Sequence, residues 1–503
     1  MRGRAGPNTV HDGPAEPFAD SRMLFEQTAR WLGGAGAAGL SHAELEAQLD
    51  AAGRKLLCQL FQDHLDLRAA TERRCEEVVD VDGICRGRTE RGHARTLATV
   101  FGDVTVTRIA YRQPGHANLH PADAALNLPA ESYSHGLRRL TAIEAARGSY
   151  DAAAEAIGRA TGHRVGHRQL GQLIERATTD FDSFYATRLP PAADSGDVLV
   201  LSADGKGIVM RHDSLRATTA KAAADVTPKL ASRLSKGEKR GRKRMATVGA
   251  VYDITPIART PADIMPVPDH DPIAGPKAIN KWLTASVTDD ATTTIAAIFA
   301  EADRRDPDHA RTWIALVDGN THQINRITAE ADNRGTTVTI LIDFIHVIEY
   351  IWGAAWCFFD EGETAAETWV AHQTSRILQG HAHQVASTIA RKARNLDPKQ
   401  RTNANACITY LRNKAPYLDY PTALASGWPI ATGIIEGACR HLICDRLDIT
   451  GARWSLNGAE AILKLRAITA NGDFNDYYQH HLSREHQRIH HSRYANHRIP
   501  QAA

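Results

Sequence analysis

The sequence has no long apolar segment. Its most apolar stretch, residues 340–352, is interrupted by the polar side chains of Asp343, His346 and Glu349, whereas a membrane-spanning helix needs about 18 or more apolar residues. The first 19 residues are rich in glycine and proline and lack the apolar centre of a signal peptide. We therefore expect a chain that is neither secreted nor membrane-spanning, with a loose tail at residues 1–19.

Cysteine is also scarce. The seven cysteines among 503 residues are widely spaced and none forms a CxxC pair, which excludes a disulfide-rich scaffold and gives no zinc-ligand spacing. Their odd number is typical of a reduced cytosolic protein. Cys75, Cys85 and His93 are spaced too irregularly for a metal site, and Cys439 and Cys444 are best explained as packing residues on a helix.

An excess of one charge is missing as well. The chain has 60 Lys and Arg against 58 Asp and Glu, a net charge of +2, so a nucleic-acid partner must be inferred from local clusters. The sequence lacks the phosphate-binding loop of P-loop proteins and the serine nucleophile elbow, so we expect no nucleotide cofactor and no serine catalysis. The length of 503 residues corresponds to roughly three domains. The 43% of hydrophobic residues is enough to form sizeable cores.

The N-terminal part of the chain has a mainly helical pattern. Apolar residues recur at three- and four-residue spacing through residues 19–74. Residues 99–108 alternate instead, which predicts two short strands that turn at Gly102 and Asp103.

Two short helices are predicted at residues 151–160 and 165–174, with a glycine-containing turn between them. This spacing is typical of a helix-turn-helix, in which the start of the second helix reads base edges in DNA. Arg164, His167 and Arg168 lie at that start. The alternative is an ordinary helical hairpin whose basic side chains are merely solvated.

The C-terminal two thirds of the chain alternates apolar strands with helices, which predicts an α/β fold. The predicted strands are residues 198–204, 245–254, 313–318 and 338–343. We divide the chain into a disordered tail at 1–19, a helical region with a small β element at 20–145, a helix-turn-helix-like segment at 146–189, the first part of the core at 195–353, an all-helical insertion at 354–426, the completion of the core at 427–475, and a basic His/Arg-rich tail at 476–503.

Three acids, Asp204, Asp318 and Asp343, stand at the ends of predicted strands. Each one alone is explained by a turn or a helix cap. Three strands of one sheet would, however, bring the three carboxylates to the same neighbourhood, where a divalent cation offsets their repulsion. Oxygen ligands without a His/Cys cluster favour Mg²⁺ or Mn²⁺, and a pair of such ions about 3.5–4 Å apart suits in-line phosphoryl transfer.

A basic run lies between the first two predicted strands of the core. Residues 236–244 carry six basic side chains beside one acid, namely Lys236, Lys239, Arg240, Arg242, Lys243 and Arg244. The run either holds a polyanionic substrate beside the metals or is a solvated, mobile loop. The two interpretations are compatible, because a mobile basic loop can become ordered on phosphate.

Several segments of the sequence together resemble one protein family. They are residues 99–108 (TVFGDVTVTR), 313–320 (WIALVDGN), 342–352 (IDFIHVIEYIW), 427–440 (GWPIATGIIEGACR), 445–455 (DRLDITGARWS) and the pair Arg493 and Tyr494. In this order they are similar to the bacterial insertion-sequence transposases of the ISKra type, in the Mutator-like branch of the DDE superfamily. The resemblance runs over most of the chain.

The resemblance implies an RNase H-like catalytic core with a mixed sheet and three acidic metal ligands. Carried over to this chain, these catalytic roles fall to Asp204 in the first predicted strand of the core, Asp318 at the end of a later strand and Glu436 in a late helix, which would hold two Mg²⁺ or Mn²⁺ ions. The helical insertion accounts for the long interval before Glu436. Asp343 and His346 match the acid-or-Cys, two residues, His motif of the Mutator-like branch, which implies an auxiliary role; the alternative is a capping Asp and a buried His.

Glu436 depends most on the resemblance, because Asp445, Asp448 and Glu460 are competing acids. Its apolar neighbours favour it, since an unpaired carboxylate among them would be costly. The residues that follow are candidates for contacts with phosphates or an unpaired base, namely Arg440, Arg446, Arg453 and Trp454. Trp454 is equally well explained as a core residue.

The resemblance implies a DNA transposase, a metal-dependent polynucleotidyl transferase that cleaves the ends of its insertion sequence and joins them to target DNA. The expected partners are the terminal inverted repeats, target DNA and further copies of the chain, in a homodimer or higher oligomer. We expect it in the bacterial cytoplasm, on the nucleoid when bound to DNA. The alternatives are a catalytically silent, domesticated transposase that only binds DNA, and a nuclease with the same core.

Overall fold

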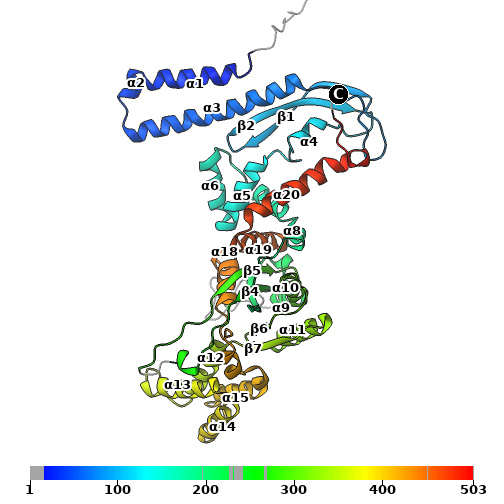
Figure 1. The fold of residues 1–503 in the computed structure, drawn as a ribbon. Helices are drawn as coiled ribbons and strands as arrows, with labels where there is room; N and C mark the ends of the chain where they lie inside the picture. The colour runs from blue at the N-terminus through cyan, green and yellow to red at the C-terminus, as the bar shows by residue number, and fades with distance from the viewer. Residues whose placement is uncertain are drawn as a thin grey trace, which may run out of the picture. The chain divides into compact units, whose positions relative to one another are not determined.

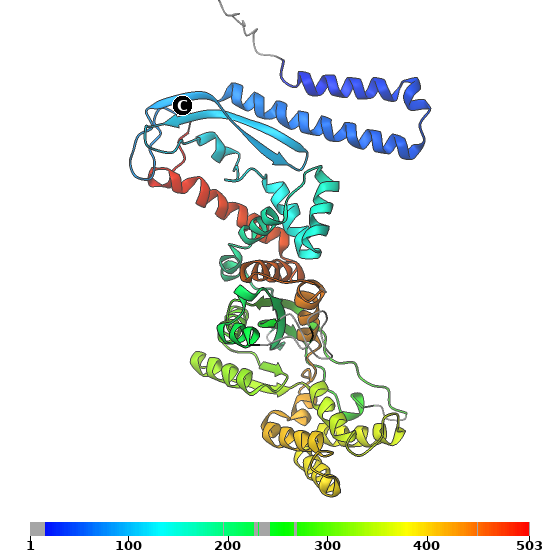
Figure 2. The same ribbon diagram turned by 180° about the vertical axis from the view of Figure 1, so that it is seen from behind.

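The computed structural model describes residues 16–194, 196–225, 230, 242–265, 269–449 and 451–501. The chain forms two compact units (Figures 1 and 2), of which unit 1 combines Met1–Asp182 with Asn475–Ala503 and unit 2 is Ser183–Phe474. Most of the predicted tail at 1–19 lies outside the described residues, as do Lys236, Lys239 and Arg240 of the basic run. None of the helices in the described ranges is both long and apolar enough to cross a membrane.

Unit 1 contains helices, one β-hairpin and the C-terminal part of the chain. Its elements are α1 (Ala19–Leu32), α2 (Ala35–Ala38), α3 (His42–Thr71), β1 (Arg88–Thr99), β2 (Gly102–Arg112), α4 (Pro121–Ala125), α5 (His135–Arg147), α6 (Tyr150–Thr161), α7 (His167–Ala177) and most of α20 (Phe474–Ile489). Helix α1 lies along α3 (Figures 1 and 2), and the backbone N–H of Ser21 donates to Asp63 across this contact.

The β-hairpin of unit 1 turns at a different place from the one predicted. The strands β1 and β2 pair antiparallel as far as Thr99 opposite Gly102, so the turn is formed by the two residues between them. The Thr99 hydroxyl donates to the Gly102 carbonyl at 2.8 Å and closes this turn. Gly102 is instead needed for close packing, because a Cβ there, at φ +139°, would lie 2.9 Å from the Cys58 sulfur on α3.

The two helices predicted around residue 162 are present. Helix α6 ends at Gly162, which adopts the left-handed conformation at φ +78°. Helix α7 begins at His167, two residues later than predicted, and its buried side chains include Leu170, Leu173 and Ile174. The predicted helix–turn–helix order of elements is therefore confirmed, whereas its use in reading DNA stays a prediction.

The segment predicted as a basic tail at 476–503 is largely ordered. It forms most of α20, whose buried side chains are Tyr477, Tyr478, His481 and Glu485. Tyr494 is 2% exposed and belongs to a core cluster with residues of β2 and of the stretch after α3. Sequence analysis missed this because aromatic and charged side chains fill the inward positions of the helix, in place of the aliphatic residues that mark a buried face.

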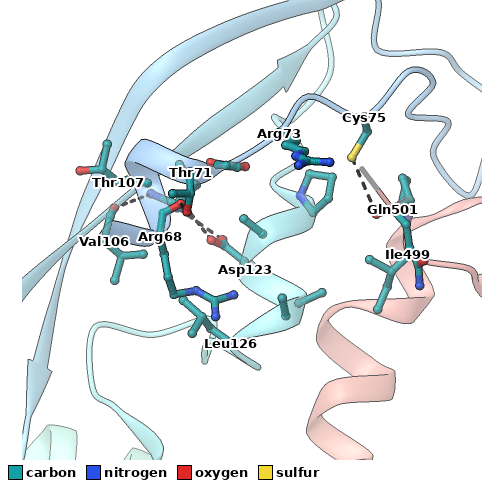
Figure 3. A pocket seen from close by; sticks show the side chains of 18 of the residues that line it. Arg68, Thr71, Arg73, Cys75, Val106, Thr107, Asp123, Leu126, Ile499 and Gln501 are labelled. Atoms are coloured by element: carbon teal, nitrogen blue, oxygen red, sulfur yellow. Dashed lines mark hydrogen bonds and ion pairs between the residues drawn. The ribbon is translucent and has the colours of Figure 1, made fainter. Parts of the chain in front are cut away.

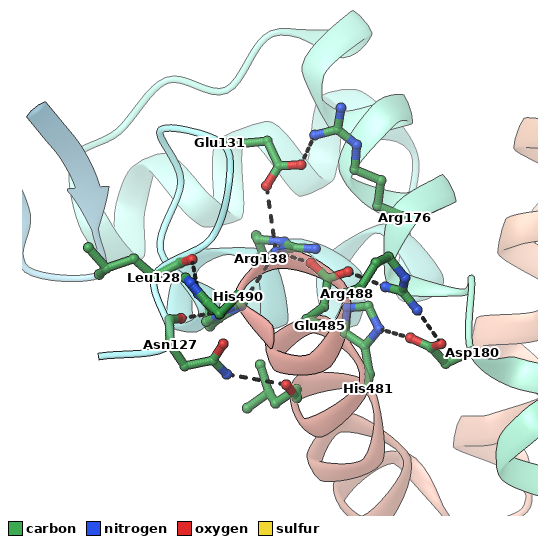
Figure 4. Close-up of polar contacts among 12 residues, drawn as sticks. Asn127, Leu128, Glu131, Arg138, Arg176, Asp180, His481, Glu485, Arg488 and His490 are labelled. Carbon is green, nitrogen blue, oxygen red and sulfur yellow. Dashed lines mark hydrogen bonds and ion pairs between the residues drawn. The ribbon is translucent and has the colours of Figure 1, made fainter. Parts of the chain in front are cut away.

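Ion pairs join α20 to the rest of unit 1 (Figure 4). Arg138 on α5 is 1% exposed and lies 3.1 Å from Glu485 on α20. Asp180 accepts from His481 at 2.8 Å and pairs with Arg488 at 2.5 Å. A buried charge that loses its partner destabilises a fold strongly, so these contacts keep the C-terminal helix within the unit.

Unit 1 is expected to lose stability as the pH falls from about 7 to about 4. Burial lowers the pKa of His120, His135 and His490 to about 4 in the folded chain, whereas an unfolded histidine has a pKa of about 6.5. Between these values the unfolded chain binds more protons, so the free energy of unfolding falls with decreasing pH.

Hydrogen–deuterium exchange of α5 and α20 peptides, corrected for the intrinsic pH effect, measures this loss. Exchange should be faster at about pH 5 than at about pH 7, and His135→Gln should reduce the difference by removing one of the three titrating groups. Equal corrected protection of these peptides at both pH values would contradict the prediction.

Unit 2 is built around a five-stranded sheet in the order β5-β4-β3-β6-β7. Its strands are β3 (Val198–Met210), β4 (Arg242–Ile254), β5 (Ala278–Ser286), β6 (Trp313–Val317) and β7 (Val338–Ile342). The pairs β3–β4 and β4–β5 are antiparallel, and β3–β6 and β6–β7 are parallel. The sheet is therefore mixed, and the predicted α/β class is confirmed.

Two features of this sheet differ from the prediction. Strand β4 begins at Arg242, so the last three residues of the basic run belong to the strand, where they pair with β3. Strand β5 was not predicted, because its first half carries polar residues and Asn280, which has a positive φ of 52°. Only its last three residues, 284–286, are continuously buried.

The remaining elements of unit 2 are helical. They are α8 (Phe181–Thr187, which begins just before the unit), α9 (Ala217–Ala224), α10 (Ala291–Arg305), α11 (Thr321–Arg334), α12 (Phe344–Ala355), α13 (Thr364–Leu378), α14 (Ala382–Lys392), α15 (Thr402–Lys414), α16 (Tyr420–Ala425), α17 (Gly433–Ala438), a π-helical segment (Cys439–Cys444), α18 (Asp445–Leu447) and α19 (Leu456–Ala470). Between β7 and α17 the described elements are helices, as the pattern of this stretch predicts.

Candidate active site

Asp204, Asp318 and Asp343 lie in one row across three parallel strands. Strand β3 pairs with β6 at an offset of 313 − 199 = 114 residues, which is also 318 − 204. Strand β6 pairs with β7 at an offset of 338 − 313 = 25, which is also 343 − 318. Extended beyond the last paired residues, these offsets place the three acids level with one another at one edge of the sheet, Asp204 within β3 and Asp318 and Asp343 directly after β6 and β7.

Asp204 is half-buried and has partners for both of its oxygens. Its Oδ1 accepts from the backbone N–H of Gly205 at 2.6 Å, and its Oδ2 accepts from the thiol of Cys439 at 3.2 Å. Burial, followed by the negative charge of Asp204, raises the pKa of the Cys439 thiol far above its ordinary value. The thiol therefore stays protonated and donates to the carboxylate.

Asp318 follows directly after β6 and is held by a tight turn. Its Oδ1 accepts from the N–H of Asn320 at 2.8 Å, and its carbonyl oxygen accepts from the hydroxyl of Tyr410 at 3.1 Å. The Tyr410 ring stacks on Tyr350, with centroids 3.9 Å apart. Gly319 has φ +91°, which permits this close approach of the backbone to Tyr410.

Gly319→Ala is expected to lower the free energy of unfolding by about 1–3 kcal/mol. The alanine would have to adopt a left-handed backbone conformation, and its Cβ would lie 2.7 Å from the Tyr410 hydroxyl oxygen. Urea denaturation measures the loss, and Gly335→Ala is the matched control because Gly335 has φ +63° with open space around it. Tyr410→Phe should recover part of the loss by removing the clashing oxygen. If Gly319→Ala costs no more than Gly335→Ala, this account of the turn is wrong.

Asp343 is 3% exposed and caps α12, since its Oδ1 accepts from the N–H of Ile345 at 3.0 Å. Its Oδ2 accepts from the hydroxyl of Thr432. Burial raises the pKa of Asp343. His346 is half-buried and lies 3.2 Å from Glu349. The capping interpretation of Asp343 is therefore confirmed, and the auxiliary role of Asp343 and His346 stays a prediction.

Glu436 lies on α17 and is exposed, so the prediction that its carboxylate would be buried among apolar neighbours is wrong. Its Oε1 is 3.5 Å from the hydroxyl oxygen of Thr432, the residue that also contacts Asp343. Three residues further on, Cys439 contacts Asp204. The helix that carries Glu436 is thus attached to two of the strand-end acids.

The acids that compete with Glu436 are engaged elsewhere. Asp445 contacts His441 at 3.0 Å, and Asp448 pairs with Lys243 at 2.9 Å. Glu460 accepts from the hydroxyl of Ser286 and from two backbone N–H groups after β5. Each of them is engaged with a partner outside the row, which favours Glu436.

The donors at this edge suit a hard divalent cation. Mg²⁺ in proteins is commonly bound through one or two carboxylates, with waters and substrate phosphates as the other ligands. Asp204 and Asp318 supply two such carboxylates on adjacent strands. Over the described ranges, no group of three or more His, Cys, Asp and Glu side chains is close enough together to hold one ion. Asp204, Asp318 and Glu436 are therefore not gathered tightly enough in this structure to hold one ion together.

Sequence analysis missed the uncharged residues that organise this edge. Thr432, Cys439 and Tyr410 contact Asp343, Asp204 and Asp318 respectively, and all three come from segments distant in the chain. Lys414 on α15 was missed too; its ammonium group donates to Thr321 at 2.7 Å, three residues after Asp318. Only the resemblance of residues 427–440 to transposases gave any signal in the sequence for the first two.

The candidate DNA-binding residues of unit 1 are on its surface. Arg164, His167 and Arg168 are exposed. His167 begins α7 and lies 2.9 Å from Asp151 on α6. Arg164 lies in the turn before α7, three residues before the helix begins.

The candidate DNA-binding residues of unit 2 divide into surface and buried groups. Arg440 and Arg453 are exposed. Lys243 pairs with Asp448, and Arg244 donates to the carbonyl of Val287 at 2.9 Å. Arg242 is half-buried in β4.

Arg446 and Trp454 do not fit the predicted surface role. They are 3% and 6% exposed, and the Arg446 guanidinium carbon lies 4.7 Å from the centre of the Trp454 ring. The indole N–H donates to the carbonyl of Leu447 at 3.1 Å. Both side chains are packed inside the fold, so the prediction that they contact phosphates or stack on a base is wrong for this structure.

A cavity of about 610 Å³ lies in unit 1 (Figure 3). Its walls come from the end of α3, from β2, from α4 and from the C-terminal residues, with Arg68, Asp123 and Ile499 among them. Asp123 is already paired with Arg108 at 2.7 Å. None of the predicted site residues lines this cavity, so the candidate active site remains the row of acids.

No protein-family model matches this chain, and no curated protein is significantly similar to it in sequence.

Proposed function

We propose that this protein is a DDE-type DNA transposase with an RNase H-like core, which cleaves the ends of an insertion sequence and transfers them to target DNA. The observation that carries the proposal is the row of Asp204 in β3 and of Asp318 and Asp343 directly after β6 and β7, with the helix of Glu436 attached to that row. The transposase-like motifs of the sequence contain Asp318, Asp343 and Glu436. The five-stranded mixed sheet is compatible with such a core.

In this proposal, Asp204, Asp318 and Glu436 are the ligands of two Mg²⁺ or Mn²⁺ ions. Such ions, when bound, stabilise both the attacking and the leaving oxygen of a phosphoryl transfer. The protein's own contribution is to hold the carboxylates on rigid strand ends and to place positive charge nearby. Lys414, beside the turn after Asp318, and Lys206 in β3 are suited to hold a phosphate at this edge.

The partners in this proposal are duplex DNA and other copies of the chain. The exposed basic residues of α7 and of the turn before it would contact the terminal inverted repeats. Two DNA ends have to be held together for transposition, so the active form is a homodimer or a higher oligomer. The protein would act in the cytoplasm, on the nucleoid.

A strand-transfer assay tests the proposal. The purified full-length chain is incubated with Mg²⁺, precut duplexes that carry the inverted repeats flanking its gene, and a supercoiled plasmid. We expect plasmid molecules joined to the duplex ends. Hydrolysis of uncut ends without joined product would indicate a nuclease, and specific binding of the ends without any cleavage would indicate a catalytically silent DNA-binding protein; either result would refute the proposal.

A further inference from the structure

We infer that Thr432 and Cys439 are positioning residues that fix the third carboxylate, Glu436, against the strand-end acids; this inference rests on the proposed function. Thr432 contacts Asp343, which follows β7, and Cys439 contacts Asp204 in β3. Glu436 lies between them in the sequence. The segment 432–439 therefore bridges two strands of the sheet, with the carboxylate near its middle.

The spacing of the three residues places them on one face of the helix. Residues at i, i+4 and i+7 lie on the same side of an α-helix, which here are Thr432, Glu436 and Cys439. The backbone N–H of Glu436 bonds to the carbonyl of Thr432 at 3.1 Å, so the helical repeat already holds at the start of this segment. Because both ends of this face contact acids of the row, Glu436 faces the row as well.

Thr432 contacts Asp343 and Glu436 differently, as expected if Asp343 is structural and Glu436 is a metal ligand. Thr432 has one hydroxyl proton, which it donates to Asp343 at close range, and Glu436 lies at the longer distance of 3.5 Å. Asp343 is buried, so it fixes the rotamer of Thr432, whereas Glu436 is exposed and keeps its Oε2 free of hydrogen bonds among the described residues. Asp343 thus fixes Thr432, and with it the start of the helix that carries Glu436.

Cys439 fixes the carboxylate of Asp204 by a hydrogen bond. Its side chain is 5% exposed, and its thiol donates to Oδ2 of Asp204 while the backbone of Gly205 donates to Oδ1. The two donors fix the plane of the carboxylate. Removing an outer partner of this kind typically lowers metal affinity by about 10–100-fold.

Binding of Mn²⁺ alone tests the inference without any need for the DNA ends. The full-length protein is titrated with Mn²⁺, and free Mn²⁺ is followed by electron paramagnetic resonance. We expect Thr432→Val and Cys439→Ala each to weaken Mn²⁺ binding by about 10-fold or more. Thr432→Ser and Cys439→Ser keep a hydroxyl donor and should remain within about threefold of the wild type.

Control variants separate positioning from loss of structure. Cys444→Ala removes a thiol from the same π-helical segment and should leave Mn²⁺ affinity unchanged, while thermal melting shows that each variant folds. If Asp204→Asn weakens Mn²⁺ binding but Thr432→Val and Cys439→Ala match the wild type, the inference is overturned and the proposed function stands. If Asp204→Asn itself has no effect on Mn²⁺ binding, the proposed metal site fails and the inference fails with it.

Discussion

Replacing Asp204 with Asn is expected to reduce strand transfer by at least about 10³-fold, the equivalent of several kcal/mol of transition-state stabilisation by metal ions. Asn has the same shape and can still accept the N–H of Gly205 through its carbonyl oxygen. Its amide group, however, replaces the oxygen that accepts from Cys439, and it carries no negative charge for a cation. Asp318→Asn should have an effect of the same size, since Asp318 directly follows β6, the strand that neighbours β3.

The measurement is joining of precut ends to a plasmid in Mg²⁺, with wild-type and variant proteins at equal concentration. Asp308→Asn is a matched control, because Asp308 is exposed in the loop before β6; it should retain full activity. Binding of the end duplex should be nearly unchanged in Asp204→Asn, which separates loss of chemistry from loss of DNA binding. An Asp204→Asn variant as active as the wild type would remove Asp204 from the site.

Asp253→Ala is expected to lower the free energy of unfolding of unit 2 by about 3–5 kcal/mol, the cost of breaking a buried ion pair from one side. Asp253 is fully buried in β4. Its carboxylate lies 2.7 Å from Arg311 and 3.3 Å from Arg305, and it accepts from the side-chain amide of Asn280 at 3.0 Å. The substitution leaves two buried guanidinium groups with too little opposing charge.

Urea denaturation followed by fluorescence measures this loss, and Asp308→Ala is the exposed control. Asp253 pairs with Leu199 at the start of β3, whereas Asp204 lies five residues further along that strand. We therefore expect Asp253→Ala to act on folding and to leave the chemistry of any protein that remains folded intact. A loss below about 1 kcal/mol would show that Arg305 and Arg311 are satisfied without Asp253.

The parts of the fold that sequence analysis predicted are those with a strong local signal. The first core strand and β6 and β7 are continuous apolar runs that end in an acid, and α6 and α7 are separated by a glycine with a left-handed backbone. The parts that were missed have polar or aromatic inward faces. Strand β5 and helix α20 are examples, since tertiary ion pairs and hydrogen bonds hold them in place of an aliphatic stripe.

The residues of the candidate site also divide into those with a local signal in the sequence and those without one. The row of Asp204, Asp318 and Asp343 could be predicted, because acids at the ends of neighbouring parallel strands meet at one edge of a sheet. Thr432 and Cys439 could not be predicted from the residues, since neither their hydrogen bonds nor their burial leaves a local pattern. The burial of Arg446 and Trp454 against each other could not be predicted either, because an arginine near an aromatic residue in the sequence is equally typical of a DNA contact.

The most direct test of the central claim is the anomalous scattering of Mn²⁺ in crystals of the full-length protein bound to its end duplex. The account predicts a peak at the ends of β3 and β6, within bonding distance of carboxylate oxygens of Asp204 and Asp318 and next to Glu436. Well-ordered DNA with no anomalous peak at this edge, or with Mn²⁺ bound only by other residues, would contradict it.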